Sequence, residues 1–333
     1  MQRTSTESNV ATAEESEKTV GETKGDKEDD IKKSVDPSSY APPDGGRDAW
    51  TTMLGVTMVS FATFGFVNAY GAFADFYNEQ YLTTYSPTLI SMIGAVQIFI
   101  LYILAGTAGA VFDAIGPRYM IPASGIVVVF SLFMLSITKS ENIYQQFLSQ
   151  SVLFSFGAAF SFFPMMGLVV HWFSTKLQYA NGCIAASASI GGMVFPIMVS
   201  RLITRIGFGW TVRVFAFIAL ASFAVGTATI KQRRPSKPFP TSLSSLFDFS
   251  GFKDPCYLFL ALGCWFSVFA IFNPFFYVQL SAQVANPDSN LNGYYLAILC
   301  AASIFGRVAP GFISLRVGRF VKRKAWPGMF SSP

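Results

Sequence analysis

Long apolar stretches alternate with short polar connections over most of the chain. An α-helix rises about 1.5 Å per residue and the hydrocarbon core of a bilayer is about 30 Å thick, so about 20 apolar residues can cross it. Eight stretches reach that length, and among them only the last contains a charge, Arg307. The pattern predicts an all-α, multi-pass membrane protein with about eight transmembrane helices. The expected spans are Thr51–Ala74, Leu89–Phe112, Tyr119–Thr138, Phe147–Val170, Ala180–Ser200, Val214–Ile230, Tyr257–Leu280 and Tyr294–Phe312.

The first 49 residues have the opposite character. They hold 7 Lys and Arg against 12 Asp and Glu, and the first 40 have almost no apolar content. Such a segment buries too little apolar surface to offset the entropy lost on ordering, so residues 1–49 are expected to form a disordered tail. The net charge of +5 therefore arises from loops beside the membrane. No basic run is interleaved with aromatic residues, and no nucleic-acid partner is expected.

Lysine and arginine are divided unequally between the two sides of the expected bundle. With the N-terminus inside, the inward loops after the tail hold 12 Lys and Arg, and the outward loops hold 4. Arg201, Arg205 and Arg213 are the exceptions on the outward side. Cytosolic loops carry the excess of positive charge in membrane proteins. The bias predicts a cytosolic N-terminus.

The longest interruption between spans suggests a division of the chain. Six spans follow one another within residues 50–230, and a basic stretch rich in Ser and Pro follows at 231–254. Two more spans lie within 255–319, and residues 320–333 contain none. We expect a six-helix bundle, a cytosolic linker, two helices of a second bundle and a short terminal tail.

Sequence motifs stand at the ends of several spans. Asp44-Gly-Gly-Arg-Asp-Ala-Trp50 precedes the first span, and Gly109–Arg118 ends the second. Gly311–Arg319, at the end of the eighth span, repeats the spacing of seven residues between two glycines. His171–Pro196 leads into and through the fifth span, and Ser303–Gly311 lies in the eighth.

Together these motifs resemble the major facilitator superfamily, and within it the monocarboxylate-porter branch found in fungi. The resemblance covers about residues 44–319. It implies two helical bundles related as parallel repeats, which move a small organic solute by alternating access. It also implies the plasma membrane as the location.

The chain departs from that family pattern at several positions. Proton-coupled members carry a lysine in span one, where this chain has Asn68, and an acidic residue one turn before the arginine of span eight, where it has Ser303. Leu315 replaces the aspartate of the second loop motif. These differences leave proton coupling open. Members of the family also have twelve spans, so the resemblance implies a C-terminally truncated or mis-spliced product.

Arg307 is the foremost candidate for substrate contact. Placing an arginine in hydrocarbon costs at least about 2.5–3.5 kcal/mol, so this side chain should face a partner or a wet cavity. A guanidinium matches the geometry of a carboxylate, which favours a role as anchor for an anionic substrate. The alternative is that it extends to the headgroups or pairs with backbone carbonyls.

Asn68 and the motif at Gly109–Arg118 lead to two further hypotheses about transport. Asn68 lies in the middle of span one and either lines the translocation cavity or forms an interhelical hydrogen bond. By resemblance, Gly109, Asp113, Gly116 and Arg118 form a gating loop, in which Asp113 faces a helix N-terminus of the other bundle. Asp113 and Arg118 could instead form a local salt bridge.

Small residues in span five predict close helix packing. Gly182, Gly191 and Gly192 would let neighbouring backbones approach, and Pro196 should bend its helix. No His, Cys or carboxylate cluster, and no phosphate-binding glycine loop, points to catalysis, a metal or another cofactor. We therefore expect no enzyme activity.

The function that these observations favour is secondary active transport. The expected partners are the lipid bilayer and a small organic substrate, with a coupled proton as an open possibility. Monocarboxylate-like compounds, riboflavin-like compounds and secreted metabolites are the candidate substrates. The alternative is a truncated, transport-inactive membrane fragment or a membrane interaction partner.

Overall fold

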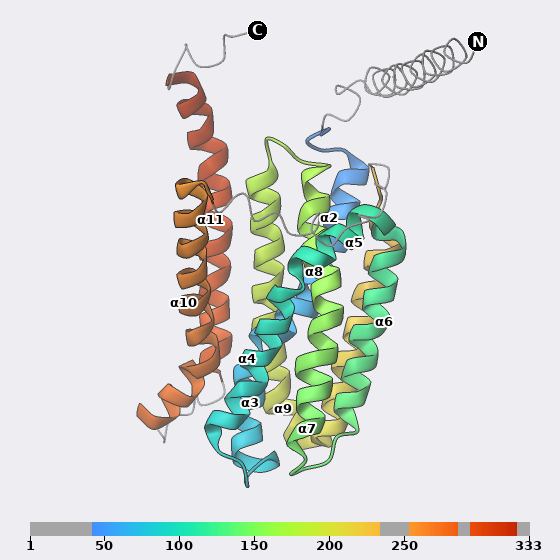
Figure 1. The fold of residues 1–333 in the computed structure, drawn as a ribbon, viewed down its shortest axis with the longest axis vertical. Coiled ribbons are helices and arrows are strands. Elements are labelled where there is room, and N and C mark those ends of the chain that lie inside the picture. The colour runs from blue at the N-terminus through green and yellow to red at the C-terminus, as the bar shows by residue number, and fades with distance from the viewer. Residues whose placement is uncertain (1–41, 234–252, 286–293, 325–333) are drawn as a thin grey trace, which may run out of the picture. The chain divides into compact units, whose positions relative to one another are not determined.

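A computed structural model describes residues 42–233, 253–285 and 294–324, and every regular element in those ranges is helical. The disordered tail expected before residue 42, most of the expected linker 231–254 and the end of the expected tail 320–333 lie outside the described residues. The all-helical prediction is confirmed. Figure 1 shows the course of the chain.

The first membrane-length segment consists of α2 (Arg47–Asn68), α3 (Tyr70–Phe76) and the π-helical turn η2 (Tyr77–Tyr81). It runs for 35 residues, and so begins before and ends after the expected Thr51–Ala74. The expectation ended at the first acidic residue beyond the apolar run, Asp75, but the helix continues and buries that residue. Helix α2 begins at Arg47, three residues before the expected start of the first bundle at residue 50.

The second segment is broken rather than continuous. It comprises α4 (Pro87–Ile103) and α5 (Ala105–Ile115), which meet at an angle of 44°. The break falls at Leu104, before a run of Ala, Gly and Thr. Glycine weakens a helix, and the Thr107 hydroxyl donates to the Leu104 carbonyl at 2.8 Å, a local bond of the kind that bends helices. The single straight span expected at Leu89–Phe112 is corrected accordingly.

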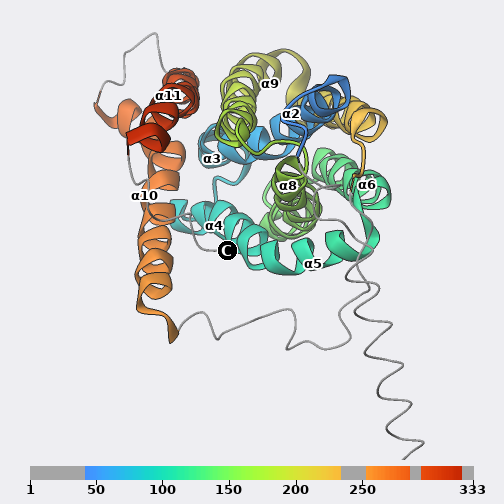
Figure 2. The same ribbon diagram turned by 90° about the horizontal axis from the view of Figure 1, so that it is seen from above.

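The third and fourth segments agree with their expected positions. They are α6 (Pro117–Ser136), and then α7 (Ile143–Gln146), the π-helical turn η3 (Phe147–Leu153) and α8 (Phe154–Val170) in succession. Viewed along the helices, α8 lies within the bundle, beside α4, α5, α6 and α2 (Figure 2).

The helix named α9 (Leu177–Thr229) contains two antiparallel helices. Gly207 has φ 79° and ψ 166°, a conformation that glycine adopts without a steric penalty. The rings of Phe195 and Phe215 lie 5.2 Å apart, whereas 20 residues of straight helix would separate them by about 30 Å. The chain therefore reverses at Gly207, and α9 supplies the fifth and sixth expected segments.

The last two helices are α10 (Pro255–Ala285) and α11 (Tyr295–Lys324). Both extend beyond the expected Tyr257–Leu280 and Tyr294–Phe312, and α11 passes the expected boundary at residue 319. Helix α11 packs along α9, and α10 contacts α3. With α4–α5 taken as one span and α9 as two, the described residues hold the eight membrane-length segments predicted.

The ends of the bundle are tied by polar contacts. At the end where α2 begins, the Asp48 carboxylate pairs with the Lys231 ammonium at 2.6 Å. At the opposite end, the Glu141 carboxylate accepts hydrogen bonds from the backbone N–H groups of Thr83 and Thr84 at 3.1 and 3.3 Å. The ion pair joins α2 to the segment after α9, and the Glu141 hydrogen bonds join the loop before α4 to the loop before α7.

Candidate functional site

Arg307 lies on α11 at its seam with the first half of α9. The guanidinium Nη1 donates a hydrogen bond to the Ala185 carbonyl of α9 at 2.9 Å, and the side chain is half-buried. The helices come close here, because a Cβ added to Gly182 would lie 3.1 Å from the Arg307 carbonyl oxygen. One turn before Arg307, the Ser303 hydroxyl lies 3.4 Å from that of Ser189. The two helices thus form a polar seam.

Asn68 approaches the same turn of α9 from another side. Its Nδ2 atom donates to the Ala188 carbonyl at 3.3 Å, and the side chain is buried. A Cβ added to Gly192 would lie 2.9 Å from the Asn68 Cβ and 2.8 Å from the Cys300 sulfur of α11. Of the two alternatives for Asn68, the structure contains the interhelical hydrogen bond. Asn68 and Arg307 therefore both donate to one helical turn, residues 185–188 of α9.

An aromatic cluster lies around Tyr102 of α4. The Tyr102 hydroxyl lies near enough to the Arg307 guanidinium for an electrostatic interaction. The Tyr102 ring lies 5.5 Å from Phe163 of α8 and 6.2 Å from Phe272 of α10, measured between ring centroids. Tyr102 is exposed and Phe272 is half-buried, so both rings have surface that the other described residues do not cover. The sequence did not identify Tyr102 or Phe272, since a chain with 35 Phe gives no local signal for either.

The chemistry available at this site suits a planar acidic molecule. A guanidinium carries five N–H donors in a fixed fork, and the bond to Ala185 uses one of them. The remaining N–H donors are spaced to bind the two oxygens of a carboxylate. The adjacent rings offer faces on which an aromatic or extended apolar body can stack. Among the described residues, no group of His, Cys, Asp and Glu could hold a metal ion.

The four residues of the expected gating loop stand where α5 meets α6. Gly116 ends α5 with φ 80°, which turns the chain so that Pro117 can begin α6. A Cβ on Gly116 would lie 2.6 Å from Oε1 of Gln232, the residue after the Lys231 partner of Asp48. Asp113 and Arg118 are exposed at this end, and Gly109 has open space beside it.

The motif before α2 forms a clasp at the same end. The Asp44 carboxylate accepts the backbone N–H groups of Ser174 and Thr175 at 2.5 and 2.8 Å, while the Asp44 N–H donates to the Trp172 carbonyl at 3.1 Å. Slight burial acts to raise the pKa of the Asp44 carboxyl, but these backbone hydrogen bonds hold it below its usual value. The ring of Trp50 packs edge-on against Phe173. The clasp ties the start of α2 to the connection between α8 and α9.

The small residues of span five occupy positions of close backbone approach. A Cβ on Gly191 would lie 2.6 Å from the Gly65 Cα and 2.6 Å from the Phe61 carbonyl, both on α2. Gly182 and Gly192 face α11 and Asn68 as described above, and Pro196 is buried within α9. These contacts are those expected of packing residues.

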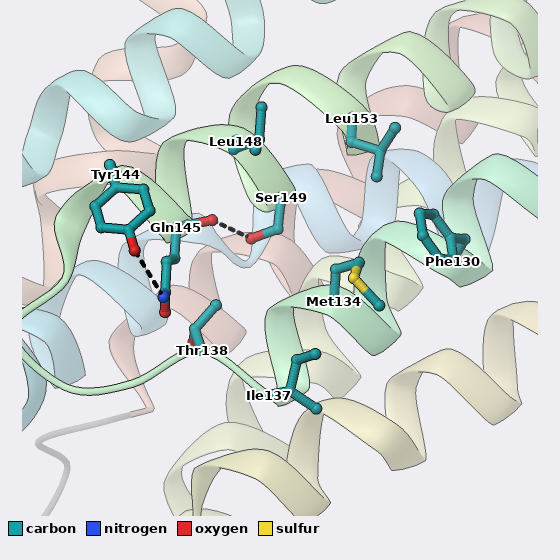
Figure 3. A pocket seen from close by; sticks show the side chains of 9 residues that line it. All are labelled: Phe130, Met134, Ile137, Thr138, Tyr144, Gln145, Leu148, Ser149 and Leu153. Carbon is teal, nitrogen blue, oxygen red and sulfur yellow. Dashed lines mark hydrogen bonds between the residues drawn. The ribbon is translucent and has the colours of Figure 1, made fainter.

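A separate cavity of about 350 Å³ lies between α6 and the α7–η3 segment (Figure 3). Figure 3 shows Tyr144, Gln145 and Leu148 on one side and Met134 and Ile137 on the other. Several of its residues are strongly exposed at the outside of the helices, and no charged residue lines it. None of the residues described above as the α9–α11 seam borders it. The lining residues are Phe130, Met134, Ile137, Thr138, Tyr144, Gln145, Leu148, Ser149 and Leu153.

Multiple apolar helices around a charged seam define an integral, multi-pass membrane protein. A family model described as Major Facilitator Superfamily matches residues 51–332, and the chain belongs to this superfamily. The match includes residues 320–332, most of the segment expected to form a separate terminal tail. Members of the superfamily are membrane transporters that bind small organic substrates, and the chain is not an enzyme.

Fungal transporters are among its similar proteins. The chain is 37% identical to the MFS transporter asaE of Aspergillus flavus over 87% of its own length and 66% of that relative. It is 39% identical to the agnestins efflux protein AgnL12 of Paecilomyces divaricatus, over 80% of the chain and 61% of the relative. It is 35% identical to the fujikurins efflux protein of Gibberella fujikuroi, over 84% of the chain and 59% of the relative. The chain thus spans roughly three fifths to two thirds of the length of these curated relatives.

Proposed function

We propose that the chain acts in the export of a small acidic organic metabolite as a secondary transporter. The observation that carries this proposal is the position of Arg307, a charge within an apolar helix that is held at a seam by one hydrogen bond. An arginine within a membrane is expensive unless it faces a partner or water, and such residues mark substrate pathways. The bond to Ala185 positions the guanidinium without consuming its capacity to bind a carboxylate.

The proposed substrate has an acidic group and an aromatic or extended apolar body. The acidic group would bind Arg307, and the body would lie against Tyr102, Phe163 and Phe272. Two of the similar proteins are named as efflux proteins for agnestins and for fujikurins, which supports export rather than uptake. Of the monocarboxylate-like, riboflavin-like and secreted compounds considered, the last class is preferred. Asn68 would set the position of α9 behind Arg307 and would not contact substrate.

The proposed transport cycle follows alternating access between two bundles. Residues 50–230 would form the first bundle, 231–254 a cytosolic linker, and 255–319 helices of the second. Gly109, Asp113, Gly116 and Arg118 would act as a gating loop at the cytosolic end. We further propose a monocarboxylate-porter-like branch within the superfamily, a cytosolic N-terminus and residence in the plasma membrane.

Gene deletion in the organism that carries this sequence tests the proposal. Acidic metabolites in cells and medium would be compared by mass spectrometry before and after the gene is restored. The proposal predicts that at least one carboxylated compound accumulates in deleted cells and returns to the medium on restoration. Unchanged distribution of every acidic metabolite would contradict it, and would favour a chain without transport activity.

A further inference from the structure

Asp75 is a buried carboxylate inside the first membrane-length segment. Only 8% of its surface is exposed, and no hydrogen bond reaches its buried Oδ2 atom from the residues that the structure describes. Within those residues, no ion pair joins it to a lysine or arginine either. An ionised carboxylate is costly to bury without a donor or a cation, and ionisable groups in membrane segments are commonly functional. Asp75 therefore needs a partner that the described residues do not supply.

The position of Asp75 on α3 places it near the contact between α3 and the last two helices. Gly71, one turn earlier on α3, lies against α10 and α11: an added Cβ would be 2.5 Å from the Phe275 carbonyl oxygen and 3.3 Å from the Leu296 side chain. Residues four apart lie on one face of a helix, so Asp75 is on the side of α3 that adjoins these two helices. This junction joins the first six segments to the last two.

The charged groups around this junction do not neutralise Asp75. Glu79 lies one turn further along, in η2, and its carboxyl group offers no positive charge to Asp75. Arg201 of α9 lies over the Tyr294 ring at 5.6 Å, while Arg213 donates to the Ser136 hydroxyl at 3.4 Å. The other titratable residues near this end of the packed elements are Tyr70, Tyr77, Tyr81, Tyr277, Tyr295 and Arg205.

From this arrangement we infer that Asp75 is a proton-binding site, and that a bound proton allows the junction between α3 and α10 to close. When the junction is open, the carboxylate meets water and releases or takes up a proton. When it closes, the neutral carboxyl is buried at far lower cost than the charged form. The inference rests on the proposed function for its role in transport, because it assigns a coupling ion to the cycle. It concerns a residue that the family motifs do not include.

Carbodiimide labelling tests the proton site without any substrate. The full chain, purified in detergent, would be treated with dicyclohexylcarbodiimide between pH 5.5 and 8.5, and modified residues would be identified by mass spectrometry. The reagent adds across the O–H bond of a protonated carboxyl: oxygen bonds to the carbodiimide carbon, the proton moves to nitrogen, and the acyl group then shifts to nitrogen. Glu79, an exposed carboxylate four residues away, is the matched control.

We expect Asp75 to be labelled, with a rate that falls about tenfold per pH unit once the group ionises. Glu79 should react little throughout. The proton site would be overturned if Asp75 is not labelled in folded protein. It would also be overturned if Asp75 is labelled no faster than Glu79, or at a rate that does not change with pH.

A transport measurement separates this inference from the proposed function. Asp75→Asn should remove the pH dependence of export, and Asp75→Glu should restore it, while Glu79→Gln leaves it unchanged. Export whose pH profile is the same in Asp75→Asn refutes the proton site but leaves the transporter intact. Labelled Asp75 in a chain that exports nothing refutes the proposed function but leaves the proton site.

Discussion

A close backbone contact between α2 and α9 provides a sharp prediction for stability. Gly191→Ala would place a Cβ 2.6 Å from the Gly65 Cα and from the Phe61 carbonyl oxygen, about 0.8 Å inside the 3.4 Å at which ordinary contact begins. Both obstacles are backbone atoms of α2, so no side chain can rotate away. Helices α2 and α9 must separate, which loosens the contacts around them. Overpacking of this kind costs about 1–3 kcal/mol.

Gly109→Ala is the matched control, because it makes the same chemical change where nothing lies within 4 Å of the new methyl group. Alanine favours a helix over glycine by about 0.5–1 kcal/mol, so this variant should be neutral or slightly more stable. Thermal unfolding of the purified proteins in detergent would be followed by intrinsic fluorescence. We expect Gly191→Ala to lower the melting temperature by about 3–10 °C and Gly109→Ala not to lower it.

The double variant Gly65→Ala/Gly191→Ala tests whether the separation of α2 from α9 causes the loss of stability. Both changes force the same two helices apart, so the second should cost less than it does alone. Equal stability of Gly191→Ala and wild type would refute the reasoning. Equal destabilisation by Gly109→Ala would also refute it, since the effect would then be independent of space.

Two further predictions concern the clasp at the end of the bundle where α2 begins. Because the pKa of Asp44 is held below its ordinary value of 3.8, its charged form stabilises the fold above that pH, and the contribution is lost as the pH falls through the folded-state pKa. Asp44→Asn should therefore lower the melting temperature at pH 7, and this loss should become smaller as the pH is lowered below 3.8. A loss that does not change with pH would contradict a charge effect. Lys231→Ala should cost less than about 1 kcal/mol, because the side chains of the Lys231–Asp48 pair are 56% and 55% exposed. A larger loss in the same unfolding assay would show that this pair is more than a surface contact.

The membrane-length segments could be predicted because length and apolarity alone define them. Their ends could not, since burial by distant parts of the chain decides whether a polar residue such as Asp75 remains helical. The reversal of α9 was expected within Arg201–Arg213 from the charges there, but its exact position depends on the backbone freedom of Gly207. The bend at Leu104 had no signal in hydropathy at all.

The candidate site was only partly predictable. Arg307 and Asn68 stand out in sequence as polar residues within apolar runs. Their convergence on residues 185–188 of α9 depends on how each helix is rotated about its axis, which hydropathy does not determine. Tyr102 and Phe272 have no sequence signal, because an aromatic residue in a membrane helix faces lipid, core or pathway equally well.

The central claim is that the Arg307 guanidinium faces the substrate pathway, and transport by reconstituted protein tests it most directly. The full chain would be placed in lipid vesicles and supplied with a carboxylated metabolite identified by gene deletion. Arg307→Ala should reduce transport by about 10–100-fold, as expected from the loss of a charge-assisted hydrogen bond worth about 1.5–3 kcal/mol. Arg307→Lys should retain part of it, and Arg205→Ala, at an exposed arginine of α9, should match wild type. Wild-type transport by Arg307→Ala, at equal amounts of folded protein, would contradict the account.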